Sequence, residues 1–335
     1  MMDGIWRFAN RLPAVSEDCK LTLGEGNTPL IRLGGTNLYV KVEGMNPTSS
    51  FKDRGVAFLI SKAKEDGAKQ AVIDSSGNAA VSASAYCARA GISITVVMPA
   101  YSHSEKKIQI LWHGGEILEV QDRDTARLYA RRISRELGIK YLGLAIEPAG
   151  VPGFQTTSYE LAAQFASDAV FIPTGSGTNL VGIGRGYSDL EKEGEVTRIP
   201  EIHCAQSDAC APISSEFTDY VPTHSTFAEG VIVPVTERKD EAVRIIRSTG
   251  GSGWIVGDDE IRNALELLAK NGIYSSPTGA VGVAGALRAN YRGSAVCVVT
   301  DSGLKSNIAP DPSKSRLTKI SSEEQLMRFI QQTNT

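Results

Sequence analysis

Residues 169–180 read Ala-Val-Phe-Ile-Pro-Thr-Gly-Ser-Gly-Thr-Asn-Leu and join an apolar strand, a glycine-rich turn and the start of a helix. A strand that is apolar at every position, as over 169–172, is typical of a parallel sheet covered on both faces. Small residues let several backbone N–H groups converge at a helix N-terminus, where a partial positive charge favours phosphate. Glycine recurs five times in this turn and helix, at Gly175, Gly177, Gly182, Gly184 and Gly186. An ordinary tight turn would explain the same order of elements, but this density of glycine favours anion binding.

The same order of strand and helix repeats along most of the chain. Hydrophobic patterning predicts strands at 38–42, 71–73, 92–98, 117–120, 141–145, 169–172, 202–206 and 295–299. It predicts helices at 52–65, 78–90, 104–112, 124–137, 154–167, 179–192, 239–248, 258–271 and 278–289. A capping box at 321–324 predicts one more short helix. Prolines and glycines crowd into residues 148–153 and predict a crossing between two lobes.

This alternation predicts an α/β fold with two three-layer αβα lobes and mostly parallel, twisted sheets. The carboxyl ends of parallel strands are where such folds bind ligands. We therefore expect a ligand in the cleft between the two lobes.

Composition excludes several classes of protein. The chain has 335 residues and a formal net charge of −3, which gives no reason to expect a nucleic-acid or acidic-membrane partner. No apolar run approaches the length of a membrane span, and the N-terminus lacks the apolar segment of a secretory signal. The five cysteines are scattered without a disulfide or zinc pattern, so we expect a reducing, cytoplasmic location and no metal.

Two further stretches carry chemistry. Ser75-Ser76-Gly77-Asn78 follows a predicted strand and opens a helix, which suits a carboxylate, although simple N-capping would need only one of these residues. Lys52 falls in the first turn of a predicted helix, where cations are disfavoured and an amine pKa is lowered, as a Schiff-base lysine requires. The stretch alone leaves open that Lys52, Asp53 and Arg54 form a solvated charge cluster.

The turn at 174–179 is neither of two common nucleotide motifs. It reads Gly-x-Gly-x-x-Leu and lacks the later acidic residue of the dinucleotide fingerprint. It also lacks the Gly-Lys-Ser/Thr of a Walker A loop. The phosphate is therefore expected on something smaller than a dinucleotide.

Taken in order, these motifs resemble the threonine synthase-like group of fold-type II pyridoxal-phosphate enzymes, in the tryptophan synthase β superfamily. The resemblance covers most of residues 20–305 and includes the stretches at 23–30, 41–55 and 299–305. It implies a pyridoxal 5′-phosphate cofactor, a small amino-acid substrate and a homodimer. It also implies a large cofactor-binding domain, formed by residues 1–54 and 148–335, and a small mobile α/β domain at 55–147.

The resemblance assigns a role to each matching residue. Lys52 would bond to the cofactor and move the substrate's α-proton. The other cofactor-binding residues would be Phe51, Asn78, Gly175, Ser176, Gly177, Thr178, Asn179 and Thr300. The substrate-binding residues would be Lys41, Ser75, Ser76 and Ala79.

The activity implied is elimination or replacement at the β or γ carbon, with threonine synthase, which converts O-phosphohomoserine and water to threonine and phosphate, as the best specific match. The sequence departs from threonine synthases at 120–124 and at 146–151, where Glu147 would repel a substrate phosphate. Arg123 or Arg185 could replace the missing cation. Alternatives are a β-eliminating or β-replacing enzyme on serine, threonine or an activated serine, such as a dehydratase or a cysteine or cysteate synthase, and a silent cofactor-holding amino-acid sensor.

Overall fold

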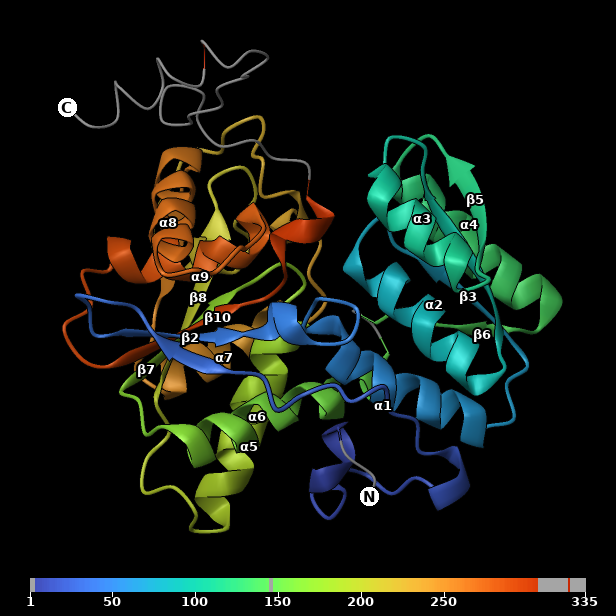
Figure 1. Cartoon of the computed structure of the whole chain (residues 1–335), viewed down its shortest axis with the longest axis horizontal. Helices are drawn as coiled ribbons and strands as arrows, with labels where there is room; N and C mark the ends of the chain where they lie inside the picture. The colour runs from blue at the N-terminus through green and yellow to red at the C-terminus, as the bar shows by residue number, and fades with distance from the viewer. Residues whose placement is uncertain (1–3, 145–146, 307–324, 326–335) are drawn as a thin grey trace.

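The computed structural model describes residues 4–144, 147–306 and 325. Two β-sheets lie side by side in the molecule, each with helices on its faces (Figure 1). The end of the predicted strand 141–145 and the helix predicted to start at 321–324 lie outside the described residues.

The larger sheet has the strand order β1-β2-β10-β7-β8-β9. Only the edge strand β1 runs antiparallel to its neighbour, and the other pairs are parallel. The strands are β1 (Leu30–Arg32), β2 (Leu38–Val42), β7 (Ala169–Pro173), β8 (Glu201–Ser207), β9 (Gly253–Val256) and β10 (Ala295–Val299).

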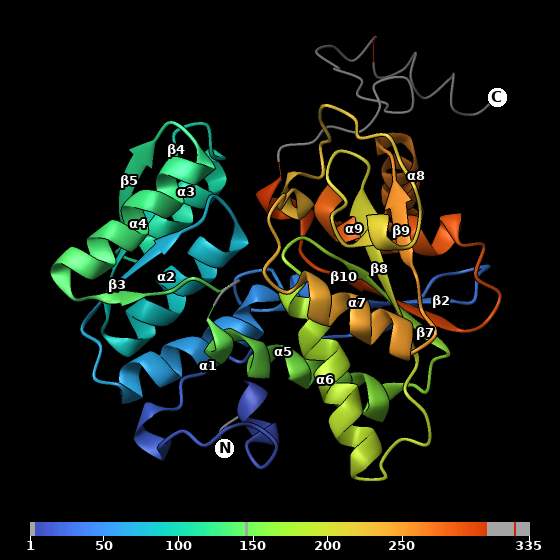
Figure 2. The same cartoon turned by 180° about the vertical axis from the view of Figure 1, so that it is seen from behind.

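Helices cover both faces of this sheet (Figure 2). They are α5 (Val151–Gln164), α6 (Thr178–Lys192), α7 (Lys239–Ser248), α8 (Asp258–Lys270) and α9 (Pro277–Arg288). Side chains alternate across a strand, so Val296 and Val298 of β10 pack with α5, α6 and α7. Cys297 and Val299 pack on the opposite face with α8 and α9. The fully apolar strand is thus explained by burial on two sides.

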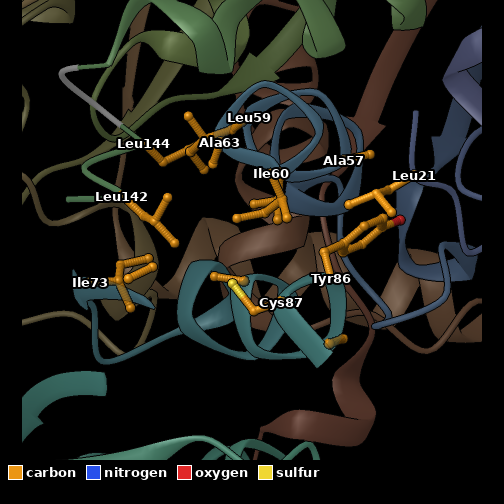
Figure 3. Packing of buried hydrophobic residues seen from close by; sticks show 14 of the residues in the cluster. Leu21, Ala57, Leu59, Ile60, Ala63, Ile73, Tyr86, Cys87, Leu142 and Leu144 are labelled. Atoms are coloured by element: carbon orange, nitrogen blue, oxygen red, sulfur yellow. The ribbon is translucent and has the colours of Figure 1, made fainter. Parts of the chain in front are cut away.

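The smaller sheet has the order β5-β4-β3-β6, and all its pairs are parallel. Its strands are β3 (Gln70–Asp74), β4 (Ser93–Pro99), β5 (Glu116–Val120) and β6 (Lys140–Tyr141). Its helices are α1 (Lys52–Glu65), α2 (Asn78–Ala90), α3 (Ser104–Trp112) and α4 (Arg123–Leu137). Ile73 packs against α1 and α2 on one face, where Figure 3 shows Ile60 and Cys87 in the same cluster. Val72 packs against α4 on the other face.

The predicted fold class is confirmed, with two αβα arrangements and mostly parallel sheets. The predicted bounds of α1, α2, α3, α7, β2 and β10 match those of the structure. The strand β9 was not predicted, because four residues led by glycine carry little local signal and gain their strand form by pairing with β8.

The crossing at 148–153 is more regular than the sequence indicated. Residues Pro148–Gly150 form a 3₁₀ turn, and α5 begins at Val151, three residues before its predicted start. Pro152 lies in the first turn of α5, where a missing N–H costs nothing. All four strands of the smaller sheet lie within residues 70–141. The division into two domains and the mobility of the smaller one stay predictions.

Within the part of the chain that the structure describes, no helix combines the length and the apolar character needed to cross a membrane.

Candidate active site

A cavity of about 540 Å³ opens where the carboxyl ends of both sheets approach each other. Its walls include the start of α1, the turn from β3 to α2, the turn from β7 to α6 and the end of β10. The structure brings nearly all the predicted site residues to this cavity: Phe51, Lys52, Ser75, Ser76, Asn78, Ala79, Gly175, Ser176, Gly177, Thr178, Asn179 and Thr300. Lys41 is the exception.

Lys52 is the first residue of α1 and lines the cavity. The backbone N–H of Phe51 donates to the Thr300 carbonyl at 2.9 Å, which joins the start of α1 to the end of β10. Lys52 Nζ lies 4.5 Å from the centroid of the Phe51 ring. Burial lowers the pKa of Lys52 from 10.5 to about 8, against an opposing pull from the Asp301 carboxylate. Roughly a tenth of the amine is therefore uncharged at pH 7, far more than for a lysine with its ordinary pKa.

The neighbours of Lys52 are not a solvated charge cluster, so that alternative is wrong. Asp53 is fully buried and accepts hydrogen bonds from Thr48 N at 2.6 Å and Ser82 Oγ at 2.6 Å. Burial raises the pKa of Asp53 to about 6 despite these bonds. Arg54 is also fully buried. Asp53 thus ties the loop before Lys52 to α2.

Lys41 belongs to a buried ion network instead of the cavity wall. Its Nζ lies 2.7 Å from Glu160 Oε2, and Arg54 Nη1 lies 2.8 Å from the other oxygen of the same carboxylate. Arg54 Nε also pairs with Glu43 at 2.7 Å. These partners hold Lys41 in the buried network, so its side chain does not line the cavity.

The turn between β7 and α6 has the geometry of an anion cradle. Gly177 has φ +79°, a left-handed conformation that other residues adopt only with strain. A Cβ at Gly175 would lie 3.0 Å from the Val233 side chain. The first N–H groups of α6 have no partner within the helix and are available to a ligand. Ser176 Oγ and Thr178 Oγ1 lie 3.0 Å apart beside them.

The turn between β3 and α2 also presents free donors. Gly77 is the N-cap of α2, and no side chain caps it, so N-capping by Ser76 or Asn78 is wrong. Asn78 Nδ2 instead donates to Asp301 Oδ2 at 2.7 Å, across the two sheets. The hydroxyls of Ser75 and Ser76 and the N–H of Ala79 remain at the cavity, as a carboxylate would need.

Three residues of the cavity carry buried polar atoms without any hydrogen-bond partner in the described chain: Asn78 Oδ1, Asn179 Oδ1 and Nδ2, and Thr300 Oγ1. Such atoms are normally paired in folded proteins. Their gathering around one cavity with a buried lysine indicates a polar ligand that completes them.

Comparison with known proteins identifies that ligand. A family model described as pyridoxal-phosphate dependent enzyme matches residues 21–303. The chain belongs to this family. It is 31% identical to a threonine synthase of Methanocaldococcus jannaschii over 98% of this chain and 87% of the relative. It is 34% identical to a threonine synthase of Halalkalibacterium halodurans over 88% of this chain and 87% of the relative.

Solved structures share the fold at lower identity. A threonine deaminase from Solanum lycopersicum superimposes with a TM-score of 0.74, at 21% identity over 90% of both chains. A maize serine racemase superimposes with a TM-score of 0.70, at 20% identity, over 92% of this chain and 94% of its own. These likenesses confirm the predicted fold-type II architecture.

The residues present fit pyridoxal phosphate. The α6 turn offers N–H groups and the unpartnered Asn179 amide to a phosphate. The Thr300 hydroxyl is free for the ring nitrogen, and Asn78 Nδ2 has a second hydrogen for the hydroxyl oxygen that the ring carries. Lys52 supplies an amine with a lowered pKa. The chain is a pyridoxal-phosphate-dependent enzyme, and its residues match what that cofactor needs.

Several cavity residues escaped the sequence analysis. Asp301 directly follows Thr300, and burial raises its pKa even though Ser276 and Asn78 donate hydrogen bonds to it. The residues around Asp301 in the sequence do not indicate that its carboxylate is functional. The only signal is that Asp301 lies in the stretch 299–305, which resembles the family. Lys106 and Arg127 also line the cavity, and their positions in ordinary polar helices gave no signal.

Proposed function

We propose that this protein is a lyase that converts O-phosphohomoserine and water to threonine and phosphate. The observation that carries the proposal is the convergence of Lys52 with the unpartnered Asn78, Asn179 and Thr300 atoms at one cavity. Relatives named threonine synthase, matched along nearly the whole chain, support this substrate.

In this proposal each residue has one task. When bound, pyridoxal phosphate supplies an electron sink for negative charge at the substrate's α carbon. Lys52 Nζ takes the α-proton and moves later protons, because an amine with a pKa of about 8 can both accept and donate near neutral pH. Ser75, Ser76 and the Ala79 N–H orient the substrate by its carboxylate at the positive end of α2.

The atoms of the reaction balance without an external oxidant or reductant. The Cγ–O bond breaks and phosphate departs, while Cγ gains a proton. Cβ loses a proton and gains the hydroxyl of water. Both proton movements occur beside Lys52, which is the one lysine placed at the start of α1 against Thr300.

The test is an assay of the purified holoenzyme with O-phosphohomoserine, following phosphate and threonine together. We expect both products in equal amounts, and none from Lys52→Ala. Release of a 2-oxoacid and ammonia from serine or threonine, with no threonine formed, would instead establish the dehydratase alternative. Retained cofactor without turnover of any amino acid would establish the sensor alternative.

We further propose that the enzyme acts in the cytoplasm as a homodimer. The resemblance to its family and the absence of a disulfide pattern among the five cysteines support this. Light scattering on the holoenzyme eluted from a size-exclusion column should give twice the chain mass of 35.8 kDa. The mass of a single chain would contradict the homodimer.

A further inference from the structure

Besides Lys52 and Arg127, which lies beside Asp74, two cationic side chains line the cavity on the side of the smaller sheet. Lys106 lies in α3, and Arg123 is the first residue of α4. Neither belongs to the α6 turn that fits the cofactor's phosphate. Arg185, the other cation considered for a substrate phosphate, lies on α6 away from the cavity and pairs with Glu241 at 2.6 Å.

Among the residues that the structure describes, neither Lys106 nor Arg123 has a carboxylate at hydrogen-bonding distance. Within residues 4–144 and 147–306, Lys106 Nζ makes no hydrogen bond or ion pair, and Arg123 makes one, from Nη1 to the Ile232 carbonyl at 2.9 Å. Their neighbours differ in this respect. Lys107 pairs with Glu119 at 2.6 Å, and Arg127 lies 3.5 Å from Asp74. Half-buried cations without a partner are costly, so these two are suited to an anion that enters the cavity.

Electrostatics place the pair near the reacting centre. Burial lowers the pKa of Lys106, while the carboxylates of Asp301 and Glu229 oppose this from a distance. The same Asp301 carboxylate acts on Lys52. Both amines are therefore within electrostatic reach of one residue at the end of β10. Arg123 also acts on Lys106, so the two cations repel each other until an anion screens them.

We propose that Lys106 and Arg123 form a second anion subsite, which takes the phosphate group of the substrate, while the α6 turn takes that of the cofactor. The assignment rests on the proposed substrate class, a phosphate monoester of a small amino acid. Arginine presents a planar fork to phosphate oxygens, and lysine adds a point charge. Glu147, which the sequence placed near this group, is not among the residues that line the cavity.

The experiment compares two unreactive probes on the holoenzyme. L-2-Amino-5-phosphonopentanoate has a methylene in place of the ester oxygen of O-phosphohomoserine, and L-norvaline has the same carbon chain without the phosphonate. Calorimetry gives both dissociation constants for wild type, Arg123→Gln, Lys106→Gln and the surface control Arg185→Gln. Binding of L-norvaline requires an intact site for the α-carboxylate. Unchanged norvaline binding therefore shows that a variant is folded.

We expect Arg123→Gln and Lys106→Gln each to weaken phosphonate binding by about ten- to a hundredfold, the loss of one charge-assisted contact. Norvaline binding should change by less than about twofold, and Arg185→Gln should change neither. Equal weakening of both probes, or no preference of the wild type for the phosphonate, would overturn the subsite.

The outcome separates this inference from the proposed function. A wild type that prefers the phosphonate but forms no threonine keeps the subsite and refutes the proposed reaction. A wild type that forms threonine while both variants keep the preference refutes the subsite alone. If L-2-aminoadipate, which ends in a carboxylate at similar reach, binds as tightly as the phosphonate, selection for phosphate is refuted.

Discussion

Lys52 shows how one side chain acquires its chemistry from its surroundings. Its amine is packed against the Phe51 ring, 4.5 Å from the centroid, at the wall of the cavity. Removing water from an ammonium group disfavours its charge more than the Asp301 carboxylate restores it. The result is an amine that is basic enough to take a proton and neutral enough to act as a nucleophile.

We predict that the cofactor-free enzyme takes up pyridoxal phosphate at a rate that rises with pH through an inflection near 8, the pKa to which burial lowers Lys52. Because burial lowers the folded pKa to about 8, roughly a tenth of the amine is neutral at pH 7, against less than about 0.1% at the ordinary value of 10.5. Stopped-flow absorbance of the bound cofactor between pH 6 and about 10 measures this.

Nα-acetyl-lysine in the same buffers is the control, and its reaction should rise only toward the ordinary value of 10.5. Lys52→Ala should show none of the absorbance change that accompanies covalent bonding of the cofactor to the amine. An inflection for the enzyme that coincides with that of acetyl-lysine would contradict the role assigned to burial.

At the scale of elements, four segments meet at one buried ion network. Arg54 of α1 binds Glu43 and Glu160, and Glu160 of α5 also binds Lys41 of β2. Burial alone would raise the pKa of Glu160, but the charges of Arg54 and Lys41 outweigh it and hold that pKa below its ordinary value. The network fixes α1, and with it Lys52, against the larger sheet.

We predict that Glu160→Gln lowers the free energy of unfolding by about 3–5 kcal/mol, because it leaves Lys41 and Arg54 buried without their shared partner. Urea denaturation measures the loss. Glu241→Gln is the matched control, since the pair with Arg185 is exposed and should contribute less than about 1 kcal/mol. Equal losses in the two variants would contradict the role of burial.

The stability lost in Glu160→Gln should depend on pH in a direction that the pKa shift of Glu160 fixes. A carboxylate with a depressed folded pKa stabilises the fold above its unfolded pKa and loses that effect as the pH falls. The stability difference between wild type and Glu160→Gln should therefore be constant near neutral pH and shrink below the ordinary value of 4.5. A difference that grows in acid would refute this linkage.

At the scale of the molecule, the part with the smaller sheet meets the part with the larger one where α1 crosses α5. A Cβ at Gly153 would lie 2.0 Å from the carbonyl oxygen of Arg54, and one at Gly55 would lie 2.4 Å from the Phe154 ring. Only glycine permits this approach, because any side chain atom would push the two backbones apart. Asn78 and Asp301 add a hydrogen bond between the two parts at the cavity.

We predict that Gly153→Ala destabilises the protein by about 3 kcal/mol or more, since a helix backbone must move to admit one methyl group. Gly67→Ala is the control, because Gly67 has φ +79° but open space around it and should cost about 1 kcal/mol. Thermal unfolding of the holoenzyme compares them. If the two substitutions lower the midpoint temperature of unfolding equally, the close approach of α1 and α5 does not stabilise the contact between the two parts.

Local pattern accounts for much of the fold. Strands such as Ala295–Val299 are apolar throughout, and helices such as Asn78–Ala90 end at a left-handed glycine, Gly91. Both signals depend only on neighbours along the chain, so the sequence reveals them. The strand Gly253–Val256 was not predicted because its extended conformation depends on pairing with β8, about 50 residues away in the sequence.

The alternating α/β elements, the Gly175–Asn179 turn and the place of Lys52 at a helix start follow from residues close in the chain, so local patterns predict them. Which charged side chains are paired depends instead on how the distant segments pack together. Lys41 is buried against Glu160, whereas Lys106 and Arg123 have no carboxylate partner among the described residues. The physical reason is that pairing and desolvation depend on side chains brought together from distant segments, as with Lys41 and Glu160, 119 residues apart.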